Sequence, residues 1–275
     1  MKSILAKQED GTIQLTITIP LEKVKKTWKE VMEETAKKAQ VPGFRKGKAP
    51  KKLVEENIEE EKTREDVLKK LLPEVYVEAV KEHNIKSIMN PQIHVQKLAD
   101  DKDWEFTAST CEAPPVKLND YKDKIKSITA KSKIVIPGKE PEQVKFDDIV
   151  KALLENVDVK VPKVLLDQEV DKILAQTLDE IKKLGLTLDQ YLGSTGRNPQ
   201  TLRHEYEQKA ENDIKLEFAL AKITEEENIV IDEKEVEEAI QKAKDESERK
   251  NLEANRYLLA SILRQQKTLD FLKNL

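Results

Sequence analysis

One short stretch of the chain combines residue types suited to binding another macromolecule. It is Val41–Pro50, with the sequence VPGFRKGKAP. Proline lacks an N–H and glycine reaches backbone angles that other residues avoid, so a shaped loop is expected here rather than a helix. Phe44 would give this loop an apolar tip, and the cations around Phe44 would give the loop a basic rim. The candidate binding residues are Gly43, Phe44, Arg45, Lys46, Gly47 and Lys48.

The charge around this loop has a single sign. Residues 35–54 contain no Asp or Glu, although 37% of the chain is charged and its formal net charge is −4. A positive patch of this kind attracts polyanions, among which nucleic acid is common. Basic runs are more often plain solvated surface, but the apolar Phe44 between two glycines favours a binding loop.

The other chemically versatile side chains form no recognisable site. His83, His94 and His204 are scattered without metal-ligand spacing. Cys111 is alone, and we expect it to be a small buried or edge residue. Gly193–Gly196 lacks the strand, helix and lysine of a phosphate-binding loop. The sequence therefore predicts no metal, no cofactor and no catalytic residue.

Composition points to a helix-rich intracellular protein. Aromatic residues make up only 4% of the 275 residues, and there are seven glycines. A single cysteine excludes a disulfide within the chain and favours a reducing compartment. The N-terminal residues carry no long apolar run, so we expect no signal peptide, no membrane span and a cytoplasmic location.

The first 112 residues are predicted to form an α+β domain. Period-two alternation over Ile13–Ile19 indicates a strand, and Glu9–Gly11 indicates a hairpin turn before it. Further helices are expected at about Leu21–Gln40, then as a short helix through Leu53, Val54 and Ile58, and then as a longer helix that carries Val67 and ends near His83. Further strands are expected at Gln92–Leu98 and Trp104–Cys111. Pro73 lies inside the longer helix, where it predicts a kink or a break. This order indicates an antiparallel sheet with helices.

The second part of the chain is predicted to be a helical body. Paired prolines at Glu112–Pro115 indicate a boundary, and residues 113–143 are expected to be an extended linker, with 116–141 strand-like or irregular. Apolar stripes then predict helices near 144–156, 162–184, 187–192, 199–223, 236–243 and 252–272. Asp232 and Glu235 match a capping box. We thus expect a domain over 144–275, although periodicity does not separate core stripes from binding surfaces.

The loop has a specific resemblance. Gly43–Pro50 resembles the ribosome-binding signature of bacterial trigger factor, a chaperone family that meets nascent chains at the ribosomal tunnel exit. Val161–Leu166 and Glu227–Asp232, each leading into a helix, are similar to the family's helical body with its arms. The resemblance implies an α+β ribosome-binding domain followed by an all-α body with arm-like helices.

One departure from the family concerns its enzymatic domain. The family normally carries an FKBP-like prolyl isomerase domain between the two parts, but only Val116–Gln143 occupies that interval here, with Tyr121 as its only aromatic residue. An aromatic-lined pocket cannot be built from so short a stretch. The chain therefore resembles a short trigger factor without this domain, and we predict that it is not an enzyme.

The resemblance implies a ribosome-associated, ATP-independent chaperone that holds unfolded polypeptide during synthesis. Its expected partners are the large ribosomal subunit and nascent or unfolded chains, with no membrane, and a homodimer away from the ribosome is a further expectation. Phe44 would enter an apolar niche, while Arg45 and Lys46 would pair with acidic side chains or rRNA phosphates. Two alternatives stay open: a stand-alone RNA-binding module that uses residues 35–54, and a residual prolyl isomerase.

Overall fold

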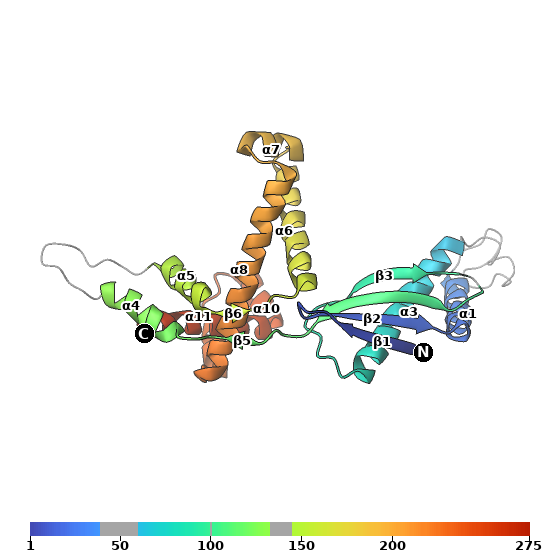
Figure 1. Cartoon of the computed structure of the whole chain (residues 1–275), viewed down its shortest axis with the longest axis horizontal. Helices are drawn as coiled ribbons and strands as arrows, with labels where there is room; N and C mark the ends of the chain where they lie inside the picture. Colours follow the sequence, from blue (N-terminus) through green and yellow to red (C-terminus); the bar gives the residue numbers. More distant parts are fainter. Residues whose placement is uncertain (39–59, 100, 133–144) are drawn as a thin grey trace, which may run out of the picture. The chain divides into compact units, whose positions relative to one another are not determined.

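The computed structural model describes residues 1–38, 60–99, 101–132 and 145–275. These residues form two compact units (Figure 1). The first contains Met1–Ala113 and Pro162–Leu165, and the second contains Pro114–Val161 and Leu166–Leu275. The first unit is an antiparallel sheet with helices and the second is mainly helical, which confirms the predicted fold class. The functional domain boundaries given above stay a prediction.

The first unit is built on a four-stranded sheet in the order β1-β2-β4-β3. Its elements are β1 (Lys2–Lys7), β2 (Thr12–Ile19), α1 (Leu21–Lys38), α3 (Glu60–Glu82), β3 (Gln92–Lys97) and β4 (Trp104–Cys111). Each neighbouring pair is antiparallel. Leu15 faces Ala108 and Ile17 faces Phe106, and directly opposed residues share a face of the sheet. The period-two pattern of β2 therefore places its isoleucines and leucine on one buried face, as predicted.

Helices α1 and α3 cover this buried face (Figure 1). Val24 and Val31 of α1, with Val67, Leu71 and Val75 of α3, belong to the same core cluster as the strands. The α3 residues are four positions apart, which is the spacing expected of a helix that packs along one side. The core of the first unit thus lies between one sheet face and one pair of helices.

The sequence predicts a kink or a break at Pro73, and the break is wrong, because α3 is one uninterrupted helix over Glu60–Glu82. Pro73 is exposed, between the buried Leu71 and Val75. A proline frees the carbonyl four residues earlier, here that of Lys69, which is also exposed and accessible to water. The lost hydrogen bond therefore lies on the solvent side, while the opposite side of the helix stays packed.

The second unit carries a helical core and a pair of short strands. Its elements are β5 (Val116–Lys117), α4 (Tyr121–Ser132), α5 (Phe146–Asn156), β6 (Asp158–Val159), α6 (Lys163–Lys183), α7 (Leu188–Thr195), α8 (Pro199–Glu226), α9 (Glu233–Gln241), α10 (Glu246–Ala254) and α11 (Arg256–Asn274). The first residues of α6, up to Leu165, belong to the first unit, and the rest of α6 belongs to the second. Its core cluster joins side chains of α4, α5, α8 and α11, among them Ile125, Ile149, Ile223 and Leu272. None of the helices in the described ranges combines the length and apolar character that a membrane span requires.

The extended linker predicted for 113–143 is wrong over α4. Tyr121, Ile125 and Thr129 are buried at helical spacing, and β5 pairs with β6. The Tyr121 hydroxyl donates to Glu227 Oε1 over 3.3 Å, so α4 is joined to the residue that follows α8. The signal was missed because this helix presents only a narrow stripe, which ends in a threonine and is surrounded by lysines. Residues 133–144 lie outside the described ranges.

Helices α6 and α8 run side by side, with α7 across their shared end (Figure 1). The turns at this end are fixed by local hydrogen bonds. Thr187 and Gln190 form a capping box at the start of α7, and Asn198 and Thr201 form another at the start of α8. Gly196 has the left-handed φ of 65° that a helix terminus often needs. The arm that the sequence predicted is therefore an α-helical hairpin with an ordered tip.

The C-terminal region departs from the sequence prediction at one point. The single helix expected over 252–272 is two helices, α10 and α11, which meet at Asn255. Asp245 caps α10 by accepting from Glu248 N over 2.8 Å. Helix α10 buries no residue, so it has no apolar stripe that periodicity could detect. The capping box at Asp232 and Glu235 is confirmed.

A four-residue segment from later in the chain contacts the β1–β2 turn of the first unit. The Asp10 carboxylate accepts from Thr12 N over 3.0 Å, from Thr12 Oγ1 over 2.8 Å and from Lys163 N over 2.9 Å. Gly11 has φ +91°, and a Cβ there would lie 3.4 Å from Pro162 Cγ. Partial burial by itself would raise the pKa of Asp10, but the hydrogen bonds outweigh it and lower the pKa below its ordinary 3.8.

We expect Asp10→Ala to destabilise the first unit by about 1 kcal/mol at neutral pH, the usual effect of removing a capping side chain. A carboxylate whose pKa is lower in the folded state stabilises the fold above its unfolded pKa, and this contribution disappears as pH falls through the folded pKa. Because Asp10 has such a lowered pKa, the difference between wild type and variant should shrink as the pH falls below 3.8 and vanish once it is below the folded-state pKa. Urea unfolding followed by tryptophan fluorescence measures this, since Trp28 and Trp104 both lie in the first unit. A difference that persists unchanged in acid would contradict the electrostatic origin.

Candidate functional site

The predicted binding loop lies between α1 and α3, and its residues Gly43, Phe44, Arg45, Lys46, Gly47 and Lys48 are outside the described ranges. The helices on either side of it are described. Thr63, near the start of α3, contacts Met32 of α1 through Oγ1 and Sδ at 3.9 Å. Lys23, near the start of α1, pairs with Glu74 and Glu78 late in α3. The two helices are therefore antiparallel, so the loop leaves and re-enters at the same end of the pair.

Charged side chains link the two helices below the loop. Lys70 Nζ of α3 lies 3.0 Å from Glu30 Oε2 and 2.9 Å from Glu34 Oε1 of α1. Hydrogen bonds to Glu34 and Glu30 raise the pKa of Lys70, which keeps this lysine charged. Exposed pairs of this kind contribute little stability. Together with the buried valines they nevertheless fix the register of the helices, and hence the two anchor points of the loop.

The arm carries an apolar pocket between α6, α7 and α8. Its volume is about 270 Å³. The lining residues are Leu174, Thr177 and Leu178 of α6, Leu188 and Leu192 of α7, and Pro199, Leu202 and Arg203 of α8. Thr177 Oγ1 is hydrogen-bonded to the Tyr206 hydroxyl at 2.9 Å, and Arg203 pairs with Glu207 at 3.2 Å. The polar members are thus occupied, and the pocket is suited to an apolar group.

Exposed leucines continue this apolar surface at the tip of the arm. The exposed fraction is 73% for Leu184, 40% for Leu186 and 37% for Leu188. The apolar stripe predicted for α6 therefore divides in two: Val170 and Ile181 are buried, whereas Leu178 and Leu184 are exposed. Sequence periodicity identified these leucines as part of a helix but not as surface, because both roles have the same spacing.

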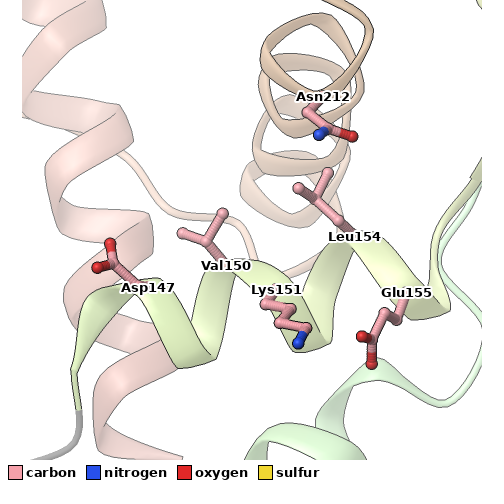
Figure 2. A pocket seen from close by; sticks show the side chains of 6 residues that line it. All are labelled: Asp147, Val150, Lys151, Leu154, Glu155 and Asn212. Atoms are coloured by element: carbon pink, nitrogen blue, oxygen red, sulfur yellow. The ribbon is translucent and has the colours of Figure 1, made fainter. Parts of the chain in front are cut away.

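A second, more open depression lies between α5 and α8 and has a volume of about 450 Å³. It is lined by Asp147, Val150, Lys151, Leu154, Glu155 and Asn212. Figure 2 shows Val150 and Leu154 pointing toward the helix that carries Asn212, while Lys151 and Glu155 point away from it. Its charged side chains, Asp147, Lys151 and Glu155, do not converge on a common point (Figure 2). Two apolar side chains with a charged border give it no catalytic arrangement.

The structure does not bring the candidate chemical residues together. Within the described ranges, no three His, Cys, Asp or Glu side chains are grouped as metal ligands would be. Cys111 is buried, as expected, and this burial raises the pKa of its thiol to about 11, so a reactive thiolate is disfavoured. Gly193 belongs to the last turns of α7, and Gly196 ends that helix. A helix C-terminus does not bind phosphate.

One polar cluster was not predicted from the sequence. Ser3 Oγ donates to Glu82 Oε2 over 2.6 Å and lies 2.8 Å from His83 Nε2. In a nucleophilic triad the imidazole stands between the serine and the carboxylate. Here the serine stands between the other two, so the cluster joins β1 to the end of α3 rather than activating a nucleophile. Ser3 lies 79 and 80 residues before Glu82 and His83 in the chain, and no sequence motif indicates that they meet.

Comparisons with known proteins agree with this architecture. The family model for bacterial trigger factor protein matches residues 1–143, and the model for the trigger factor C-terminus matches residues 120–274. The trigger factors of Staphylococcus aureus strains JH9 and Newman are each 38% identical over 122 residues, which is 44% of this chain and 28% of theirs. The chain thus spans little more than a quarter of the length of these relatives.

A solved structure shares the fold over the whole chain. It comes from a study of promiscuous substrate recognition in folding and assembly activities of the trigger factor chaperone. The TM-score is 0.65 at 12% identity, with 100% of this chain and 99% of the other covered. At this identity the likeness concerns the fold alone. The two family models, each of which matches more than half of the chain, show that this protein belongs to the bacterial trigger factor family of chaperones.

Proposed function

We propose that this protein is a ribosome-associated, ATP-independent chaperone that holds unfolded polypeptide during synthesis. The observation that carries the proposal is the apolar tip of the arm, where Leu184, Leu186 and Leu188 are exposed beside an apolar pocket. Exposed apolar surface of this kind commonly marks an interaction site. Apolar segments of an unfolded chain would be held there by weak contacts and would leave by simple exchange, without nucleotide hydrolysis.

The loop between α1 and α3 would dock this holding surface on the large ribosomal subunit. Phe44 would enter an apolar niche, Arg45 would make bidentate contacts to carboxylate or phosphate, and Lys46 would add a further ion pair. Gly43 and Gly47 would shape the turn, and Lys48 would strengthen the local positive field. The antiparallel helix pair supports this role, since it presents both ends of the loop from one rigid base.

The proposal is tested with the full chain in two assays. The protein should co-sediment with large ribosomal subunits, and it should suppress aggregation of an unfolded model protein with no nucleotide present. If the wild-type protein does not bind large ribosomal subunits, the proposed docking is wrong. If it does not suppress aggregation, the proposed holding activity is wrong. A stand-alone RNA-binding module would instead bind naked rRNA as tightly as intact subunits, so the same titration with protein-free rRNA separates this alternative.

We expect no acceleration of prolyl isomerisation. The short interval at 116–143 is partly occupied by α4, whose Tyr121 and Ile125 are buried in the core of the second unit. These residues are therefore engaged in helix packing and do not contribute to a separate catalytic pocket. Uncatalysed isomerisation takes roughly tens to hundreds of seconds, which makes even modest catalysis visible with an Ala-Pro peptide. A rate clearly above that background would contradict the prediction and restore the enzymatic alternative.

A further inference from the structure

Helix α6, which begins the arm, has no capping residue of its own. Val161 and Pro162 precede it, and the side chains of its first turn, Lys163–Leu166, carry no hydrogen-bond acceptor. The first N–H groups of a helix have no partner within the helix, and a side-chain oxygen of Ser, Thr, Asp or Asn usually accepts from them. Four later helices have such caps from their own sequence: Thr187, Asn198, Asp232 and Asp245.

The cap of α6 comes from the β1–β2 turn instead. Asp10 accepts from Lys163 N over 2.9 Å, so its carboxylate acts as an N-cap although it lies 153 positions earlier in the chain. Leu165 N donates to Pro162 O over 3.0 Å, and Pro162 itself has no N–H. A negative charge at this end also interacts favourably with the helix dipole. The first turn of α6 therefore owes part of its order to Asp10.

The β1–β2 turn holds this cap in position by itself. Gln8 N donates to Thr12 O over 2.8 Å, and Gly11 N donates to Gln8 O over 3.1 Å. The Asp10 carboxylate also accepts from Thr12 N and from Thr12 Oγ1. All these hydrogen bonds lie within residues 8–12, so none of them is lost when Lys163 moves away. The cap is thus preformed whether or not α6 occupies it.

The segment that brings Lys163 to the turn is held by few contacts. Pro162 lies close to Gly11, where an added Cβ would be 3.4 Å from Pro162 Cγ, and Val164 is 5% exposed. Lys163 is exposed, and its bond to Asp10 lies at the surface. Among the described residues of the core cluster between sheet and helices, none comes from Pro162–Leu165. A contact of this size can open while the rest of the unit stays folded.

We propose that Asp10 is a removable cap, and that the segment Pro162–Leu165 alternates between a bound state and a released state. In the bound state the segment contacts the β1–β2 turn, and the first turn of α6 is helical. In the released state this turn loses its cap and frays, so its residues lengthen the connection between β6 and α6. The pocket of the arm begins at Leu174, about two turns further along α6, and keeps its structure in both states.

Hydrogen exchange of the full chain, in urea concentrations below the unfolding transition, distinguishes a removable segment from a permanent one. A local opening exposes little surface, so the exchange rates at Val164–Leu166 should hardly depend on urea. The amides of β2 open only with the sheet, so their exchange rates should rise steeply with urea. If Val164–Leu166 show the same urea dependence as β2, the segment leaves only when the unit unfolds, and the proposal is wrong.

Removing the cap tests the role of Asp10. Asp10→Ala should raise the exchange rate at Val164–Leu166 roughly fivefold or more, as expected for the loss of one N-cap, and leave that of Thr177 unchanged. Thr12→Val is the matched control, because it removes the hydroxyl bond to Asp10 but leaves the carboxylate beside Lys163. This control should exchange at close to the wild-type rate. An unchanged rate in Asp10→Ala, or an equal rise in Thr12→Val, would overturn the proposal.

A cap supplied by α6 itself should reverse the effect. Pro162 directly precedes the first helical residue, so Pro162→Asp in the Asp10→Ala background places a carboxylate at the N-cap position. Exchange at Val164–Leu166 should return close to the wild-type rate, even though the contact of Pro162 with Gly11 is removed. Continued fast exchange would show that contact with the turn, and not the cap, orders this helix start, and would also overturn the proposal. Exchange of the β2 amides and circular dichroism report whether each variant is folded.

Discussion

A variant with Phe44→Ala, Arg45→Ala and Lys46→Ala should no longer co-sediment with ribosomes. Losing an apolar anchor and two charge-assisted contacts should cost about 3–6 kcal/mol of binding. This is on the order of a hundredfold or more in affinity. The sequence predicts an exposed loop, and on that expectation the free energy of unfolding should change by no more than roughly 1 kcal/mol. Binding is measured by pelleting with ribosomes, and folding by circular dichroism and urea unfolding.

Salt separates the contributions of the three residues. Ionic contacts weaken as ionic strength rises, whereas an apolar contact does not. Phe44→Ala should therefore lower affinity at every salt concentration, while Arg45→Ala should mainly flatten the salt dependence. Lys25→Ala with Lys26→Ala is a matched control, because it removes two exposed cations from α1 away from the loop. A triple variant that pellets like wild type would place the docking surface elsewhere, and one that unfolds would show that Phe44 is a core residue.

Replacing Leu184, Leu186 and Leu188 by serine should remove most of the protection against aggregation. Fully burying one leucine side chain is worth about 1.5–3 kcal/mol. Three partly covered leucines should therefore contribute about 2–4 kcal/mol to client binding, or about thirtyfold and more in affinity. The variant should need a correspondingly higher concentration for half-maximal protection of an unfolded model protein, as followed by light scattering. Leu184 is 73% exposed, but Leu186 and Leu188 are only 40% and 37% exposed, so urea unfolding of the variant is the control that it stays folded.

An equally apolar surface elsewhere in the same unit serves as the comparison. On α11, Tyr257, Leu258 and Ile262 are 91%, 59% and 50% exposed. If their replacement by serine removes protection while the arm variant protects like wild type, the holding surface is on α11 and the assignment to the arm is wrong. If only the arm variant fails, exposure alone does not make a holding surface, and the adjoining pocket is what distinguishes the tip.

The sequence predicted those elements in which a local pattern and tertiary burial agree. The alternation of β2 could be recognised because one whole face of this strand is buried. Helix α8 could be recognised because Asn198 and Pro199 are residues typical of a helix start. Helix α4 was missed because its burial depends on Tyr121, Ile125 and Thr129 meeting α5, α8 and α11. Such contacts are made by residues far apart in the chain, and a narrow stripe among lysines does not reveal them.

The candidate sites divide in a similar way. The binding loop was predicted from composition, because glycines, prolines and an unusual one-sign charge are local signals, and its role stays a prediction. The arm surface was not identified, because Val170 and Leu184 belong to the same apolar stripe predicted for 162–184, and only the neighbouring helices decide which of the two is covered.

The contact between Asp10 and Lys163 determines when, during synthesis, the first unit can finish folding. Strands β1–β4 and helices α1 and α3 all lie within the first 113 residues, so this part of the chain can assemble early. The turn at Asp10, however, receives its third hydrogen bond from a residue 153 positions later. Until that residue has left the ribosome, the carboxylate has only its Thr12 donors. A protein that we propose holds nascent chains would thus, as a nascent chain itself, complete its N-terminal unit only after residue Lys163 has been synthesised.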